Sequence, residues 1–225
     1  MGKIILYHGS TKIIERPLLG VGNPKNDYGL GFYCTENLEL AKEWASTEMS
    51  DGFTNEYELD LIGLKILYLN QEPYHILNWL AILLKNRIFL LSQGLANEAR
   101  DYVLDAFLPN YENYDVIIGY RADDSYFSFA NAFLNNTISL EQLRKAMYLG
   151  KLGEQIVIKS QKAFNSLKYL GSNPVISSQY YPKRQARDIQ ARNEFHGMKS
   201  QSSSTDSVYV IDILRQKWTN DDARL

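Results

Sequence analysis

Three short segments of this 225-residue chain place polar side chains and glycines beside expected strands. They are 6–10 (LYHGS), 28–35 (YGLGFYCT) and 153–158 (GEQIVI). A histidine can both donate and accept hydrogen bonds, and a tyrosine ring offers apolar surface for stacking. One such segment alone is weak evidence, because paired glycines and strand-end histidines are common. Their joint occurrence predicts a polar binding site built from residues far apart in the sequence.

Each segment also has a structural interpretation. Tyr33 could belong to the core, as strand tyrosines often do, and Glu154 could be a solvated strand-end charge. Asp123 and Asp124 suit the N-terminus of a helix beginning near Ser125, or else substrate binding or proton acceptance. We give these two interpretations of the aspartate pair equal weight. No histidine or further carboxylate lies at ligand spacing, so no metal site is predicted.

The elements that must position these residues are mixed. Hydrophobic and β-branched patterns predict both strands and helices. The expected strands are 3–7, 31–35, one or two within 57–69, 115–120, 154–159 and 175–178. The expected helices are 37–44, two within 74–107 divided near Gly94, 125–134, 139–148 and 160–167. Without strict strand–helix alternation, this order favours an α+β fold.

A composition change at Pro182 suggests three parts. Residues 1–181 form the expected catalytic domain, 182–207 a polar linker that is disordered or weakly helical, and 208–225 a C-terminal helix or tail. Within the last part, apolar residues of 208–218 are expected to dock on the body.

Composition excludes several classes of protein. The net charge of −2 gives no global reason to expect a nucleic-acid or membrane partner. The single cysteine, Cys34, excludes a disulfide framework and a multi-cysteine metal site, and it fits a reducing cytoplasm. The N-terminal residues lack the apolar run of a signal peptide. We therefore expect a cytoplasmic protein that does not span a membrane.

The three segments together resemble the histidine–tyrosine–glutamate signature of the diphtheria-toxin and poly(ADP-ribose) polymerase branch of the ADP-ribosyltransferases. Residues 119–124 (GYRADD) add a likeness to a bacterial family of the same superfamily whose members often neighbour small antitoxin-like proteins. The resemblance covers residues 6–170. It implies a split antiparallel core of two small sheets, with a helical insertion around 74–107 and NAD as co-substrate.

The resemblance also implies roles for individual residues. His8 would hydrogen-bond the adenine-side ribose, the Gly9 backbone would anchor the nicotinamide amide, and Tyr33 would stack on the nicotinamide ring. Ser10 would add a hydroxyl on the ribose side. The expected NAD-binding set is His8, Gly9, Ser10, Gly31, Tyr33 and Thr35.

The acidic position of the signature is ambiguous in this chain. Glu154 is the candidate that binds the nicotinamide ribose and opposes developing positive charge, but Gln155 stands where much of the family has glutamine. Successive strand residues point to opposite faces, so only one of them can enter the pocket. We favour Glu154 slightly, since the chemistry gains from a charge. If Gln155 faces the pocket, Asp123 or Asp124 could supply the missing acid.

The leading function is ADP-ribose transfer to a protein or nucleic-acid acceptor by a bacterial toxin or effector, with a small antitoxin protein as a second partner. The alternatives are an NAD glycohydrolase and a degenerate NAD-binding interaction module without turnover. A phosphate-removing RNA enzyme on a related scaffold is disfavoured, because its basic pocket residues are not found at matching places.

Overall fold

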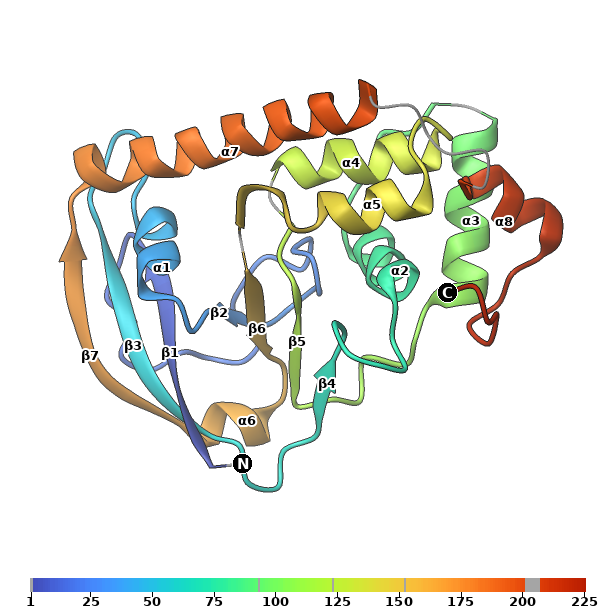
Figure 1. Cartoon of the computed structure of the whole chain (residues 1–225). Helices are drawn as coiled ribbons and strands as arrows, with labels where there is room; N and C mark the ends of the chain where they lie inside the picture. Colours follow the sequence, from blue (N-terminus) through green and yellow to red (C-terminus); the bar gives the residue numbers. More distant parts are fainter. Residues whose placement is uncertain (1, 93, 123, 152, 201–206) are drawn as a thin grey trace.

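The computed structural model has a mixed α+β architecture with two sheets, and it describes residues 2–92, 94–122, 124–151, 153–200 and 207–225 (Figure 1). One sheet has the order β1-β3-β7 and is antiparallel. Its strands are β1 (Lys3–Ser10), β3 (Gly52–Asp60) and β7 (Leu167–Val175). The predicted α+β class is therefore confirmed.

The second sheet has the order β2-β6-β5-β4. Its strands are β2 (Phe32–Cys34), β6 (Glu154–Ile158), β5 (Val116–Tyr120) and β4 (Ile66–Tyr68). The β2–β6 and β6–β5 pairs are antiparallel, but β4 and β5 run parallel. The expectation of wholly antiparallel sheets is therefore wrong for this last pair, because a long connection that contains α2 and α3 separates its strands.

The two sheets meet where β1 approaches β2. Tyr7 and Thr35 exchange backbone hydrogen bonds of 2.8 and 3.0 Å, which join the sheets edge to edge at this point. Below this junction, apolar side chains from both sheets form a shared core that includes Leu6, Phe32 and Tyr57. Burial of this apolar surface fixes the relative position of the segments that carry His8 and Tyr33.

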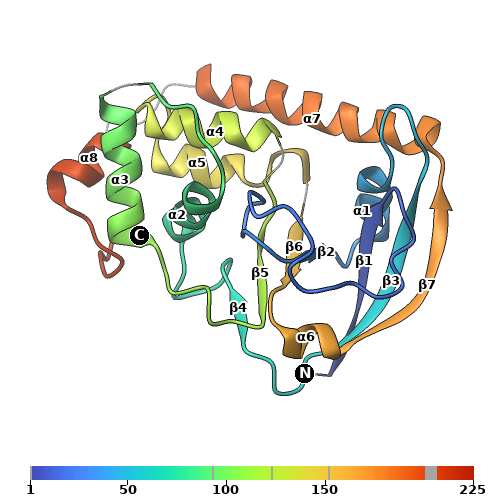
Figure 2. The ribbon, with the colours of Figure 1, turned by 180° about the vertical axis from the view of Figure 1, so that it is seen from behind.

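Helices cover the four-stranded sheet and form the larger core. Figures 1 and 2 show α2, α3, α4, α5 and α8 gathered on the side of this sheet away from β1, β3 and β7. The elements are α2 (Ile76–Asn86), α3 (Leu95–Phe107), α4 (Asp124–Leu134), α5 (Leu140–Ala146) and α8 (Val210–Gln216). The predicted pair of helices within 74–107 is confirmed, and so is the helix within 208–218.

Local signals explain several helix ends. Ser139 and Gln142 form the predicted capping box at α5, with the Ser139 hydroxyl accepting from the Gln142 backbone at 3.2 Å. The side chain of Asn37 caps α1 (Leu38–Ala45), and that of Ser160 caps α6 (Gln161–Asn165). A 3₁₀ turn, η1 (Leu149–Lys151), precedes β6.

Most of the segment that is expected to be a polar linker, disordered or weakly helical, forms a helix. Residues 177–200 form α7 (Ser177–Ser200), so the predicted boundary between 181 and 182 falls inside a helix that contains Pro182. Residues 201–206 of the expected linker lie outside the described part. Figures 1 and 2 show α7 running from above α1 to above α4. The segment 177–200 therefore packs against the rest of the protein and does not extend from it as a linker.

One face of α7 explains this packing. Arg187 binds both carboxylate oxygens of buried Glu43 in α1, at 2.7 and 2.8 Å. Four and eight residues further on, Ala191 and Phe195 are buried, and the Phe195 ring stacks on Phe129 of α4 at 4.1 Å. These spacings place all three residues on one side of the helix. The structure also corrects the short strand expected at 175–178, because β7 ends at Val175 and Ser177 begins α7.

Within the described ranges, no helix has both the length and the apolar character needed to cross a membrane.

Candidate functional site

A cavity of about 300 Å³ opens where β1 and β2 meet, bordered by α1, β6 and α7. Its wall brings together residues from distant parts of the chain. The lining residues are Tyr7, His8, Gly9, Asn26, Asp27, Tyr33, Cys34, Thr35, Ala41, Trp44, Arg87, Arg121, Ala122, Gln155 and Arg184. Of the residues predicted for the site, it includes His8, Gly9, Tyr33, Thr35 and Gln155. Ser10, Gly31 and Glu154 do not line it.

His8 is held by the segment that carries Tyr33. Its Nδ1 lies 2.7 Å from the Tyr33 backbone carbonyl, and its ring packs on Phe32 at 4.3 Å. A carbonyl oxygen only accepts, so Nδ1 must carry the hydrogen and Nε2 of the neutral ring is an acceptor. Burial lowers the pKa of His8, and Arg121 adds a smaller contribution in the same direction. The site therefore presents a neutral imidazole at neutral pH.

Tyr33 has its hydroxyl fixed by a preceding turn. The hydroxyl donates to the Gly29 carbonyl and accepts from the Tyr28 backbone N–H at 3.1 Å. Burial raises the pKa of Tyr33, so the phenol stays protonated. With both functions of the hydroxyl engaged, Tyr33 contributes ring surface to the cavity rather than an acid or a base.

Two signature glycines are needed for packing. A Cβ at Gly9 would lie 2.1 Å from the Ala41 carbonyl oxygen, because α1 crosses β1 closely there. A Cβ at Gly31 would lie 2.6 Å from a methyl carbon of Val157. Gly9 still borders the cavity, whereas Gly31 supports it from behind. These contacts account for both glycines without a ligand.

The two hydroxyl residues of the predicted set differ in position. The Thr35 Oγ1 accepts from the Asn37 backbone N–H at 3.1 Å, and this residue borders the cavity. The Ser10 Oγ instead donates to the Lys12 carbonyl and accepts from Asn55 at 3.1 Å. Ser10 therefore stabilises the end of β1 and does not face the site.

Gln155, and not Glu154, enters the cavity, which corrects our preference for Glu154. Gln155 is buried, while Glu154 is exposed on the opposite face of β6, where its carboxylate accepts from Asn70. Burial raises the pKa of Glu154, and Glu36 contributes to this shift. Successive residues of a strand point to opposite faces, and Gln155 and Glu154 are neighbours on β6 opposite Gly119 and Tyr120 of β5, so only one of them can face the cavity.

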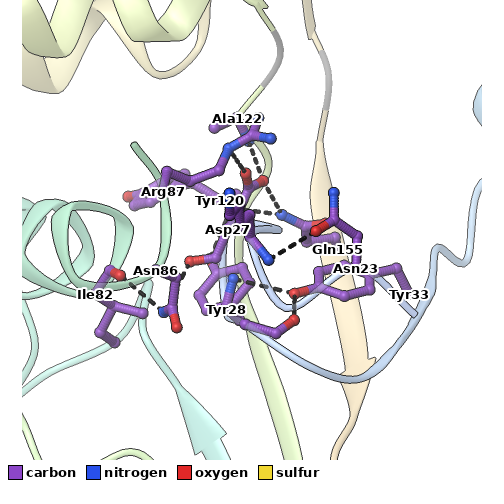
Figure 3. Close-up of polar contacts among 12 residues, drawn as sticks. Asn23, Asp27, Tyr28, Tyr33, Ile82, Asn86, Arg87, Tyr120, Ala122 and Gln155 are labelled. Carbon is purple, nitrogen blue, oxygen red and sulfur yellow. Dashed lines mark hydrogen bonds and ion pairs between the residues drawn. The ribbon is translucent and has the colours of Figure 1, made fainter. Parts of the chain in front are cut away.

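Asp27 is a site residue that the sequence did not reveal. This buried carboxylate accepts from Gln155 Nε2 at 2.7 Å and from the Ala122 backbone N–H at 3.0 Å, and it forms an ion pair with Arg87 at 3.1 Å (Figure 3). Burial raises the pKa of Asp27, while Arg87, Gln155 and Ala122 oppose the shift. All three neighbours are donors, so the surroundings accommodate the ionised form.

The Asp27 network determines which end of the Gln155 amide faces the cavity. The Gln155 Nε2 faces two acceptors, the Asp27 carboxylate and the Tyr120 carbonyl, the latter at 3.4 Å. The amide nitrogen must therefore occupy this side. Its carbonyl oxygen is left as the group that can accept a hydrogen bond from a ligand.

Another part of the cavity lining is cationic. The guanidinium carbons of Arg121 and Arg184 each lie 3.9 Å from the centroid of the Trp44 ring. Arg184 comes from α7, in the segment that we expected to be a linker. Both guanidinium groups therefore place positive charge at the cavity and stack on the indole ring.

Two further predictions concern the aspartate pair and metals. Asp123 and the side chain of Asp124 lie outside the described part, so their proposed functional and capping roles stay predictions. Among the residues that are described, no cluster of three or more His, Cys, Asp or Glu side chains could hold a metal ion.

The family model "Protein of unknown function (DUF3990)" matches residues 4–169. This segment is well over half of the 225 residues, so the chain belongs to that family. No curated protein and no solved structure matches the chain. The matched segment contains the strand-borne site residues and ends before α7.

Proposed function

We propose that this member of the DUF3990 family binds NAD in the cavity and transfers ADP-ribose to a macromolecular acceptor, with its two sheets as the split core of an ADP-ribosyltransferase. One observation carries the proposal. His8, Tyr33 and Gln155 are at least 25 positions apart in the sequence, and all three line one cavity. These three segments carry the sequence resemblance, so their meeting at one cavity supports it.

The residues present fit an NAD molecule. The His8 Nε2 can accept from a ribose hydroxyl, and the Tyr33 ring offers a flat surface for nicotinamide. The Gln155 carbonyl oxygen can accept from a hydroxyl of the second ribose. In addition, the Trp44 Nε1 is buried without a hydrogen-bond partner among the described residues, which marks a donor that a ligand could satisfy.

NAD supplies a ribosyl carbon whose bond to nicotinamide breaks as the acceptor bonds to it and loses a proton. The protein stabilises the positive charge that develops on the ribose. Gln155 contributes no formal charge, but Asp27 lies directly behind its amide at 2.7 Å. We propose that Asp27 polarises the Gln155 amide toward the ribose, while Arg87 offsets part of the Asp27 charge. This arrangement favours a slower enzyme than one with a glutamate in the cavity.

The test uses two neighbouring residues on β6 as a matched pair. Nicotinamide release from labelled NAD is measured with and without a cell lysate for Gln155→Ala and Glu154→Gln, and folding is checked by thermal unfolding. We expect loss of release in Gln155→Ala and near-normal release in Glu154→Gln. Loss only in Glu154→Gln would contradict the proposed site.

The same assay separates the alternatives. Label that enters lysate material and is removed by protease or by nuclease identifies the acceptor class. Nicotinamide release without label transfer indicates an NAD glycohydrolase, and tight NAD binding without release indicates a binding module. Addition of the small antitoxin-like protein expected as a partner should suppress release.

The cationic wall favours one second candidate. The phosphate-removing RNA enzyme was disfavoured for lack of basic pocket residues, yet Arg87, Arg121 and Arg184 all line the cavity. A phosphorylated RNA oligonucleotide incubated with NAD tests this candidate directly. Loss of the RNA phosphate would favour the RNA enzyme over the transferase.

A further inference from the structure

The cavity lining carries more positive than negative charge. Among the described lining residues there are three arginines and one carboxylate, Asp27, and the pKa of His8 is lowered. Asp27 is already engaged by Arg87 and Gln155. The cavity as a whole is therefore suited to a ligand that carries more than one negative charge.

The positive charge is concentrated around one indole ring. Arg121, from the loop after β5, and Arg184, from α7, each place a guanidinium carbon 3.9 Å from the Trp44 ring centroid. The Trp44 Nε1 supplies a buried N–H without a partner in the described residues. Arg121, Arg184 and Trp44 all line the same cavity, and their N–H groups are the donors that two linked phosphates would need.

α7 holds Arg184 in this position. Arg187, three residues further along, is bound by both carboxylate oxygens of Glu43 and donates to the Gly150 carbonyl at 2.8 Å. Ala191, one helical turn after Arg187, packs against Gly150. A Cβ added to Gly150 would lie 3.1 Å from the Ala191 Cβ. Residues 184, 187 and 191 share one helix face. The rigid attachment of α7 therefore extends to the arginine at the cavity.

We propose that Arg121, Arg184 and Trp44 form a diphosphate subsite, and that α7 is part of the ligand-binding site. This inference rests on the proposed function, because it assigns the diphosphate of NAD to the subsite. Arg184 lies beyond residues 4–169, so the family segment alone holds an incomplete site. The subsite accounts for the buried indole N–H, which has no partner in the described part of the chain, and for an arginine on the inner face of α7.

The test compares ligands that share parts of NAD. Calorimetry on the full chain measures binding of NAD, ADP, inorganic pyrophosphate and nicotinamide riboside, which has no phosphate. The variants are Arg184→Ala and, as a matched control, Lys183→Ala. Lys183 is the neighbouring cation on α7, is exposed, and does not line the cavity.

We expect Arg184→Ala to weaken NAD and ADP binding about 10- to 100-fold, in line with loss of a charge-assisted hydrogen bond. Lys183→Ala should stay within about 3-fold, and Arg184→Lys should recover part of the loss. Binding of nicotinamide riboside should not change in Arg184→Ala. Equal weakening of the riboside, or unchanged affinity for ADP and NAD, would overturn the subsite.

Failure of this inference and failure of the proposed function can be told apart. If the protein binds ADP and pyrophosphate through Arg184 but never releases nicotinamide, the subsite stands and the transferase proposal fails. If nicotinamide is released normally by Arg184→Ala with unchanged NAD affinity, the proposed function stands and the subsite is wrong. If single-stranded RNA binds through Arg184 more tightly than ADP, the diphosphate assignment is wrong.

Discussion

Two parts of the cavity lining differ in charge and in how their polar groups are engaged. One wall, which we call the strand wall, consists of His8, Tyr33 and Gln155. The His8 Nδ1, the Tyr33 hydroxyl and the Gln155 Nε2 are all hydrogen-bonded to other protein groups. On the second wall, which we call the helical wall, Arg184 of α7 and Arg121 of the loop after β5 bring positive charge, and Trp44 of α1 has a buried N–H without a partner among the described residues. The strand wall can orient an uncharged part of a ligand, and the helical wall can bind an anionic part. Shape and charge are thus supplied by different elements.

The largest effect is expected where the strand wall is given an extra charge. Gln155→Glu places a second carboxylate beside Asp27, and an uncompensated buried charge costs about 3–5 kcal/mol of stability. One of the two carboxyl pKa values must rise, so the variant should regain stability as the pH falls and a proton is bound. Urea unfolding between pH 5 and 8 measures this.

A second substitution controls that experiment. Asp27→Asn in the Gln155→Glu background replaces the repulsion with a hydrogen bond from the new amide, and it should restore stability at pH 8. Glu154→Gln should leave stability almost unchanged, since Glu154 is on the exposed face. If Gln155→Glu were as stable as the original chain at pH 8, the Asp27–Gln155 contact would be wrong.

The next effect concerns the attachment of the helical wall. Glu43→Ala leaves Arg187 without the partner that it binds at 2.7 and 2.8 Å. The Arg187 side chain is 26% exposed, so we expect about 3 kcal/mol, the lower end for a broken buried pair. Glu39→Ala removes the exposed pair with Lys42 and should cost under about 1 kcal/mol. Equal costs in urea unfolding would show that α7 is not held by Arg187.

A smaller effect is expected from the imidazole of the strand wall. His8→Ala removes the Nε2 acceptor proposed to bind a ribose hydroxyl, and we expect NAD affinity to fall by about 1–3 kcal/mol in calorimetry. Nicotinamide riboside should respond less than NAD, because the proposed His8 partner is the adenine-side ribose. Unchanged affinity for NAD would remove His8 from the binding site.

The smallest effect is a pH dependence of folding. The pKa of His8 is lowered below the 6.5 of an ordinary histidine, so between those two values the unfolded chain binds more protons than the native one. The free energy of unfolding should therefore fall as the pH drops through 6.5, by less than about 1.4 kcal/mol per pH unit. Asp27, whose pKa is raised, contributes with the opposite sign at lower pH.

His8→Asn provides the comparison, because its amide can still donate to the Tyr33 carbonyl but does not titrate. The difference between the two stability curves isolates the histidine. Parallel curves from pH 7.5 down to pH 5 would mean that the native environment leaves the proton affinity of His8 unchanged.

Sequence patterns predicted most strands and helices of the fold, because local periodicity determines the type of an element and capping residues determine where a helix begins. They missed β7, an edge strand whose Gly171, Asn173 and Pro174 are poor strand formers. They also missed α7, because its inner face carries Arg184 and Arg187 beside only two buried apolar residues. A helix attached through charges lacks the apolar stripe that reveals an amphipathic helix.

The candidate site was predictable in the same partial way. His8 and Tyr33 stood in recognisable glycine-rich segments, and the strand period showed that only one of Glu154 and Gln155 could face inward. Asp27 lay in a polar loop where nothing in the local sequence separates a buried carboxylate from a solvated one. Its role depends on three donors brought from other parts of the chain, which only the tertiary structure assembles.

The position of α7 late in the chain also sets the order in which the cavity is assembled. Protein synthesis proceeds from the N-terminus, and early segments can begin to fold before later ones are made. The strand wall is present once β6, which ends at Ile158, has left the ribosome, but Arg184 follows 26 residues later. A nascent chain therefore carries a site without its full charge. With the proposed diphosphate subsite, binding of a phosphorylated ligand therefore requires synthesis to have passed α7.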